Sequence, residues 1–115
     1  MPSGYHEKQL SDAVKDEHRA LVSLQEELEA VDWYNQRADV ATDEELKAIL
    51  IHNRDEETEH AAMLLEWLRR NRPGFAKKLG TYLFKTLPIT ELEEAQESGG
   101  AGDGSLGIGS DKQQQ

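Results

Sequence analysis

Apolar side chains recur at steps of three and four along the first third of the chain, which is the spacing of one face of an α-helix. These positions are Leu10, Val14, Leu21, Leu24, Leu28 and Val31. They predict a first helix near residues 6–37. A second apolar row predicts a helix near 43–71, at Leu46, Ile49, Leu50, Leu64, Trp67 and Leu68.

Turn signals mark the ends of the second helix. Thr42-Asp43-Glu44-Glu45 has the pattern of a capping box, in which Thr42 caps the first turn and Glu45 bonds back to it. Pro73 ends the helix, because proline lacks an amide hydrogen and restricts the residue before it. A shorter third helix is predicted near 74–85, ahead of Pro88. The expected fold is all-α, with two long antiparallel helices and a short C-terminal helix.

The composition changes near residue 90. Six of the nine glycines follow that point, together with six acidic residues and a single lysine. Glycine-rich, charged segments with few apolar residues bury too little surface to fold. We therefore predict a helical subunit over 1–90 and a flexible tail over 91–115.

Composition also excludes several classes of protein. The chain has no cysteine, which removes disulfides, thiolate metal sites and cysteine nucleophiles. A net charge of −10 argues against nucleic-acid binding and favours the attraction of cations. No apolar run approaches the roughly 20 residues that span a bilayer, so we expect a soluble, unexported protein. With 115 residues a single copy has little core, so association is expected.

Polar residues interrupt the apolar stripe in the middle of the second helix. Asn53, Glu57 and His60 lie on the same face as the leucines that flank them, and Glu27 shares a face of the first helix with Leu24. Di-iron helix bundles take a Glu from each of two helices and a Glu-x-x-His pair from each of the other two. This chain has one of each. A two-fold dimer would therefore complete the set as a four-helix bundle.

Other interpretations of these residues remain open. Glu-x-x-His is common on solvated helices. Glu27 could be a charge at the edge of the helix interface, His60 a hydrogen-bonded core histidine, and Asn53 a buried polar residue that fixes register. His18 and His52 are better explained as surface or core residues than as ligands.

Acidic and aromatic residues surround Glu27. Glu26 and Glu29 lie on an adjoining face and could guide cations inward, although a solvated acidic face explains them equally well. Trp33 and Tyr34 are packing residues first, and Tyr34 could also hydrogen-bond near the metals.

Four segments of the sequence are distinctive: EELEAVDWY at 26–34, HNRDEE at 52–57, EHAAM at 59–63 and LEWLRRN at 65–71. Together they resemble encapsulated ferritins, over roughly residues 10–90. The resemblance implies a subunit that completes a ferritin-like bundle by dimerising, with the dimers assembled into a ring, commonly a decamer. It implies two iron ions per dimer at a ferroxidase centre of Glu27, Glu57 and His60.

The resemblance also assigns roles to the neighbouring residues. Glu26 and Glu29 would be cation-entry ligands, where calcium can replace iron, with Trp33 near that path and Tyr34 near the centre. The family delivers oxidised iron into an encapsulin shell, which places the chain in a bacterial or archaeal cytoplasm, inside that compartment.

The tail carries one further signal. The segment 104–110, GSLGIGS, resembles the peptide that docks cargo inside encapsulin shells, with Leu106 and Ile108 as its anchors. Two apolar residues one apart on an extended strand can enter neighbouring pockets of a groove. Without the resemblance, an unstructured linker is the simpler interpretation.

The predicted function is therefore oxidation of iron(II) to iron(III) by a homo-oligomeric ferroxidase. Two rivals remain. One is a non-catalytic helical cargo or adaptor protein, and the other is a structural zinc or calcium site that holds a dimer without turnover.

Overall fold

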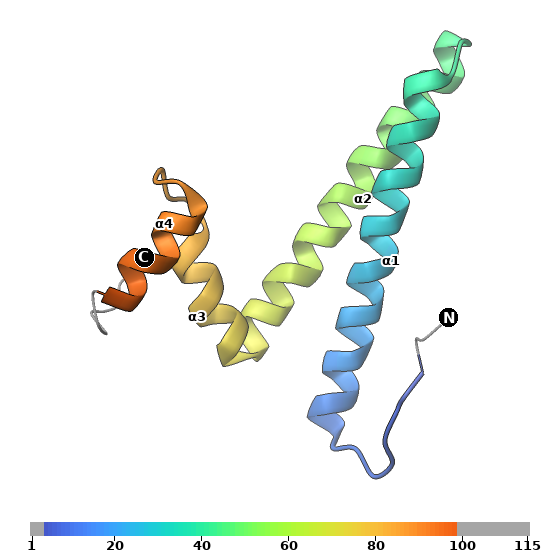
Figure 1. Cartoon of the computed structure of the whole chain (residues 1–115). Helices are drawn as coiled ribbons and strands as arrows, with labels where there is room; N and C mark the ends of the chain where they lie inside the picture. Colours follow the sequence, from blue (N-terminus) through green and yellow to red (C-terminus); the bar gives the residue numbers. More distant parts are fainter. Residues whose placement is uncertain (1–3, 99–115) are drawn as a thin grey trace. The chain divides into compact units, whose positions relative to one another are not determined.

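The computed structural model describes residues 4–98, which form four α-helices and no strand (Figure 1). The helices are α1 (Asp12–Val40), α2 (Glu44–Asn71), α3 (Pro73–Tyr82) and α4 (Ile89–Ser98). The predicted all-α fold with two long helices is confirmed. None of these four helices has the length and apolarity needed to cross a membrane. The chain divides into two compact units between Leu68 and Arg69.

The first unit is a hairpin of α1 and α2, which run antiparallel because only residues 41–43 connect them (Figure 1). α1 begins at Asp12, later than the predicted residue 6. The backbone amide of Val14 donates to Ser11 Oγ at 3.2 Å, so Ser11 is the N-cap. Gln9, with a φ of 60°, interrupts any earlier helical turn. The apolar spacing that starts at Leu10 thus extends beyond the helix itself.

The predicted cap of α2 at Thr42 is wrong by one residue. The backbone amide of Leu46 donates to Asp43 Oδ2 at 2.9 Å, which makes Asp43 the N-cap. Its carboxylate also stabilises the positive end of the helix dipole. The acidic residues at the start of α2 therefore stabilise the helix directly, and Thr42 belongs to the connection.

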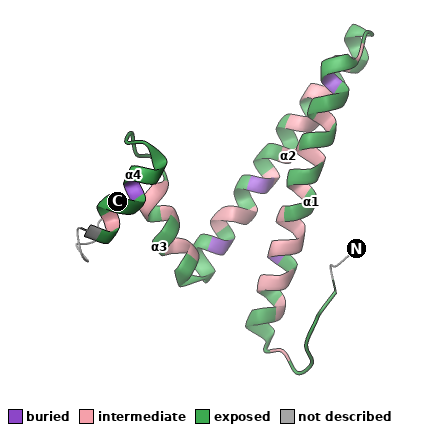
Figure 2. Ribbon diagram, in the orientation of Figure 1, coloured by how far each residue is buried: buried purple, intermediate pink, exposed green. Residues whose placement is uncertain are grey.

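The buried residues of the first unit are mostly small. They are Ala20, Ala38, Ala61 and Leu68, of which only Leu68 is large. Small side chains let two helices approach closely, but they bury little apolar area. Several large apolar side chains are at least half exposed, including Leu28, Val40, Ile49 and Met63. Most of the hairpin surface is accordingly exposed or half-buried (Figure 2), and one copy leaves much apolar surface in water.

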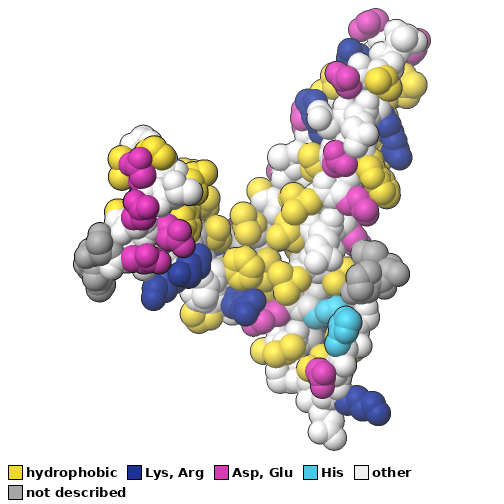
Figure 3. All heavy atoms as spheres, viewed as in Figure 1, with side chains coloured by type: hydrophobic (Ala, Val, Ile, Leu, Met, Phe, Trp, Pro, Cys, Tyr) yellow, Lys and Arg dark blue, Asp and Glu magenta, His cyan; other side chains and the backbone are white. Residues whose placement is uncertain are grey.

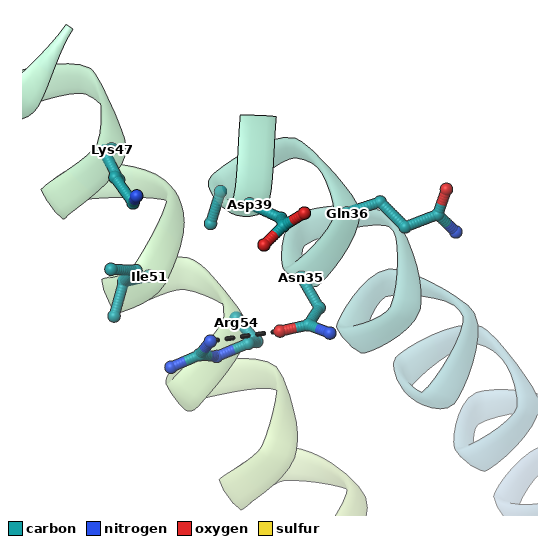
Figure 4. Close-up of a pocket in the computed structure, with 7 residues that line it drawn as sticks. Asn35, Gln36, Asp39, Lys47, Ile51 and Arg54 are labelled. Carbon is teal, nitrogen blue, oxygen red and sulfur yellow. Dashed lines mark hydrogen bonds between the residues drawn. The ribbon is translucent and has the colours of Figure 1, made fainter. Parts of the chain in front are cut away.

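A hydrogen bond sets the register of α1 against α2. Arg54 Nη1 donates to Asn35 Oδ1 at 3.0 Å across the hairpin (Figure 4). Arg54 Nε also donates to Asp55 Oδ1 at 3.1 Å, which orients the guanidinium. Arg54 and Asn35 border a cleft of about 290 Å³ whose other lining residues are Gln36, Ala38, Asp39, Lys47 and Ile51. Arg54 precedes Glu57 by three residues, so this bond aligns the helices close to the predicted ligands.

The second unit contains α3 and α4, which pack against each other. Pro73 is at the first position of α3, where its missing amide hydrogen is not needed. Near the other end, Lys85 Nζ donates to the carbonyl oxygen of Gly80 at 2.7 Å. Phe84, with a φ of 60° and a wholly exposed side chain, lies in the connection to α4.

Residues 91–98 form most of α4, although the composition had grouped them with the tail. The amides of Glu91 and Leu92 donate to the carbonyl oxygen of Pro88, which starts the helix. Leu92 is buried, and glutamate is a good helix former. The glycine-rich composition starts only at Gly99, beyond the helix. The predicted docking residues Leu106 and Ile108 lie outside the described residues.

Replacement of the α2 cap tests this fold directly. We expect Asp43→Ala to lower the free energy of unfolding by about 1 kcal/mol, because the Leu46 amide loses its acceptor. Urea unfolding of the metal-free protein at fixed concentration measures the change. Thr42→Ala is the matched control and should be close to neutral. A larger loss for Thr42→Ala than for Asp43→Ala would show that the cap is misassigned.

Candidate metal centre

Glu27, Glu57 and His60 come together in the middle of the hairpin. Glu27 lies on α1, and Glu57 and His60 lie one turn apart on α2, so that the i, i+3 spacing points both toward α1. One ligand atom of each residue lies within 4.8 Å of the other two. No other group of three or more histidine, aspartate or glutamate side chains is this close within residues 4–98.

His60 is the centre of this group. Its Nδ1 forms a hydrogen bond with Glu57 Oε1 at 3.1 Å and lies 3.6 Å from Glu27 Oε1. The side chains of both glutamates are 26% exposed and that of His60 is 42% exposed. The group is therefore neither sealed in a core nor fully solvated. All three side chains are partly accessible to solvent, and therefore also to a ligand.

The electrostatics of the three residues are coupled. A hydrogen bond with Glu57 raises the pKa of Glu27, and partial burial and the charge of Glu57 raise it further, against the opposing effect of His60. The same hydrogen bond lowers the pKa of Glu57, with help from His60. The hydrogen bond to Glu57 also raises the pKa of His60, aided by the charges of Glu27 and Glu57. These shifts arise because two carboxylates and one imidazole lie close together, and a bound cation would neutralise the charge of such a group.

The donors fit iron. Two carboxylates and one imidazole are the ligand types that iron(II) and iron(III) bind, and carboxylates can bridge two metals. One copy supplies only three such residues, which is too few to fill the coordination of two iron ions. Further ligands would have to reach the metals from the solvent-exposed part of these three side chains.

The neighbouring predicted residues are placed differently. Glu26 and Glu29 are exposed on α1 and take no part in the three-residue group. The guanidinium of Arg37 lies 5.8 Å from the ring of Trp33 and 5.4 Å from the ring of Tyr34. Tyr34 is seven residues from Glu27, which is about 10 Å along a helix. Within one copy, Tyr34 is thus a neighbour of Arg37 rather than of the three ligands.

Two other histidines, His18 and His52, were predicted to be surface or core residues. The ring of His18 packs against Tyr5, with the ring centres 4.8 Å apart. His52 is exposed on α2, and Asn53 is half-buried there. None of these residues joins the group of Glu27, Glu57 and His60.

Glu56 was not predicted from the sequence. Its Oε1 lies 3.9 Å from Nε2, the ring nitrogen of His60 that does not bond to Glu57. Glu56 precedes His60 by four residues, so the signal was its place on the same helix face one turn earlier. His60 therefore has a carboxylate near each of its two ring nitrogens.

An all-α fold with a cluster of carboxylates and a histidine is typical of the ferritin-like class of proteins. The EncFtn-like family matches residues 4–86, and the chain belongs to this family. The predicted likeness to encapsulated ferritins is thereby confirmed.

Relatives cover most of the chain. The "Encapsulated ferritin-like protein" of Rhodospirillum rubrum is 58% identical in an alignment of 113 positions that covers 88% of this chain and 81% of that protein. The "Ferritin-like protein" of Thermotoga maritima is 56% identical in an alignment of 112 positions that covers 94% of this chain and 97% of that protein. The crystal structure of protein ne0167 from Nitrosomonas europaea is similar with a TM-score of 0.72 and 64% identity, and covers 75% of this chain and 97% of that one.

The raised pKa of His60 predicts how metal binding depends on pH. A metal at Nδ1 must displace a proton, so binding should weaken as the pH falls through the pKa of His60. Below that pKa we expect about a tenfold loss of affinity per pH unit for each proton displaced. Calorimetric titration with zinc(II) at about pH 6 and about pH 8 measures the difference. Equal affinities at the two pH values would argue against binding through His60.

Proposed function

We propose that this chain is a ferroxidase that oxidises iron(II) to iron(III) at a di-iron site formed across a two-fold dimer. The observation that carries the proposal is the convergence of Glu27, Glu57 and His60 within 4.8 Å, as a set with too few donors for two metals. A second copy facing the first would double the set to six protein ligands. Membership of the EncFtn-like family supports the same chemistry.

The surface of one copy also favours a partner. Large apolar side chains stay exposed along the hairpin, among them Leu46, Ile49, Met63 and Trp67. Yellow hydrophobic side chains reach the surface in several places along α1 and α2 (Figure 3). Contact with a second hairpin would remove apolar area from water at about 25 cal/mol per Å². The same contact would cover the open side of the metal-binding group.

In the proposed reaction iron is the substrate and molecular oxygen the oxidant. Each iron(II) gives up one electron, so that a pair of iron ions supplies the two electrons that, with two protons, convert oxygen to hydrogen peroxide. The carboxylates of Glu27 and Glu57 stabilise the higher charge of iron(III) and hold both ions within reach of one oxygen molecule. His60 supplies a neutral nitrogen donor that keeps the total charge of the site moderate.

Several finer points belong to the same proposal. Dimers would assemble into a ring of ten chains, in which Glu26 and Glu29 guide iron or calcium toward the site past Trp33. Tyr34 is about two helical turns from Glu27 in its own chain, so a role near the metals would require the ring of a partner copy.

The proposed destination of the iron is an encapsulin shell. The name of the Rhodospirillum rubrum relative describes that protein as encapsulated, and the segment around Leu106 and Ile108 has the composition of a docking peptide. An extended peptide with two apolar anchors would bind a groove on the inner wall of the shell. The compartment would then receive iron(III) as it forms.

Replacement of each ligand tests the catalytic assignment. We expect Glu27→Ala, Glu57→Ala and His60→Ala to slow iron(II) oxidation by more than the roughly 10–100-fold that loss of an outer-shell partner costs. Oxygen consumption and the absorbance of iron(III) measure the rate. Glu59→Ala, which removes a nearby exposed carboxylate, is the control and should keep the rate. If the three variants oxidise iron as fast as the unchanged chain, the ferroxidase site lies elsewhere.

Assembly tests the shared site. Because the ligands of both copies meet at the metals, metal at about 100 times its dissociation constant should favour the dimer by about 2.7 kcal/mol. Sedimentation velocity with and without zinc(II), near the midpoint of dimer formation, measures this shift. Glu57→Ala should abolish the effect of the metal. If zinc(II) changes the association of neither the unchanged chain nor Glu57→Ala, the alternative of a non-catalytic adaptor protein is favoured instead.

A further inference from the structure

The two ring nitrogens of His60 face different carboxylates. Nδ1 lies 3.1 Å from Glu57 Oε1 and 3.6 Å from Glu27 Oε1, whereas Nε2 lies 3.9 Å from Glu56 Oε1. Glu27 and Glu57 belong to the proposed iron site, and Glu56 does not. One histidine thus connects the ligand group to a carboxylate outside it.

This geometry determines which nitrogen can bind metal. An ion held by Glu27 and Glu57 would reach His60 through Nδ1, because the shortest contact of each carboxylate with the ring is to that nitrogen. A coordinating imidazole must leave its lone pair free at the bound nitrogen. The remaining proton of the neutral ring is then at Nε2. Histidine ligands almost always donate this second N–H to a carboxylate, a carbonyl oxygen or water.

We propose that Glu56 is the acceptor of this proton and acts as a positioning residue for His60. The inference rests on the proposed function, because it requires Glu27, Glu57 and His60 to bind metal. Glu56 would hold the ring with Nδ1 toward the metal and would make Nδ1 a stronger donor.

Glu56 is well placed to form such a bond. It lies one turn before His60 on the same face of α2, and its side chain is 49% exposed, so it has room to change rotamer. The present 3.9 Å separation exceeds hydrogen-bond length. Rotation of either side chain would be needed to close that gap. Glu56 is the carboxylate whose shortest contact with His60 is to Nε2, whereas the shortest contacts of Glu27 and Glu57 are to Nδ1.

Metal affinity measures this effect without any turnover. Zinc(II) is redox-inert and takes the same donor types, so its dissociation constant can be determined by chelator competition on the full chain. We expect Glu56→Ala to weaken zinc binding by about 10–100-fold. Glu56→Gln keeps an oxygen acceptor without the charge and should lose less. Glu59→Ala, an equal loss of charge about 100° around the helix from His60, is the matched control and should bind zinc as the unchanged chain does.

A spectroscopic signature separates positioning from a general change of charge. In the zinc-loaded protein the Nε2 proton of His60 should resonate downfield and exchange slowly with water, because it is held by a carboxylate. Glu56→Ala should abolish that signal and Glu59→Ala should retain it. Circular dichroism should show equal helix content in the Glu56 and Glu59 variants, since both side chains are exposed.

The two proposals fail in different ways. If Glu56→Ala and Glu59→Ala bind zinc equally and the His60 proton is unchanged, the role of Glu56 is overturned while the site stands. If Glu57→Ala and His60→Ala also bind zinc as tightly as the unchanged chain, the iron site itself is wrong.

Discussion

The molecule is organised around charge held between two helices. Two carboxylates and an imidazole lie within 4.8 Å of one another on a half-buried surface, where water cannot fully solvate them. Without a metal, hydrogen bonds relieve the repulsion. The pKa of Glu27 rises while the pKa of Glu57 falls, both mainly through the hydrogen bond between them, and the pKa of His60 rises beside Glu57. A divalent cation bound by all three residues would replace the protons that they share and would neutralise the negative charge of the carboxylates.

One copy of the hairpin buries few large side chains. Its buried residues are chiefly alanines, which allow close approach of α1 and α2 but contribute little buried area. The hydrogen bond between Arg54 and Asn35 aligns the helices, and the caps at Ser11 and Asp43 define where they begin. These contacts align Glu27 on α1 with Glu57 and His60 on α2, and they leave the three side chains partly exposed. A second copy would complete the core and the metal site together, which explains why a small, thinly packed unit could carry such chemistry.

The sequence predicted what depends on local spacing. The steps of three and four along α2 placed Glu57 and His60 on one face, and the short connection after α1 made the helices antiparallel, which brought Glu27 opposite them. Features that shift with a single residue along the chain were harder to predict. The cap belongs to Asp43 rather than Thr42, because the helix starts one residue later than the box pattern suggests. α4 was missed since its glutamates resemble a solvated tail, whereas the burial of Leu92 appears only in the folded chain. The approach of Glu56 to His60 depends on side-chain rotamers, which spacing does not specify.

The most direct measurement is anomalous diffraction at the iron edge from crystals of the protein grown with iron(II) in the absence of oxygen. A pair of iron peaks on a two-fold axis should appear, each pair contacted by Glu27, Glu57 and His60 Nδ1 from both copies. Iron bound by the residues of one copy alone, or peaks remote from His60 while Glu57 points into solvent, would contradict a shared di-iron centre.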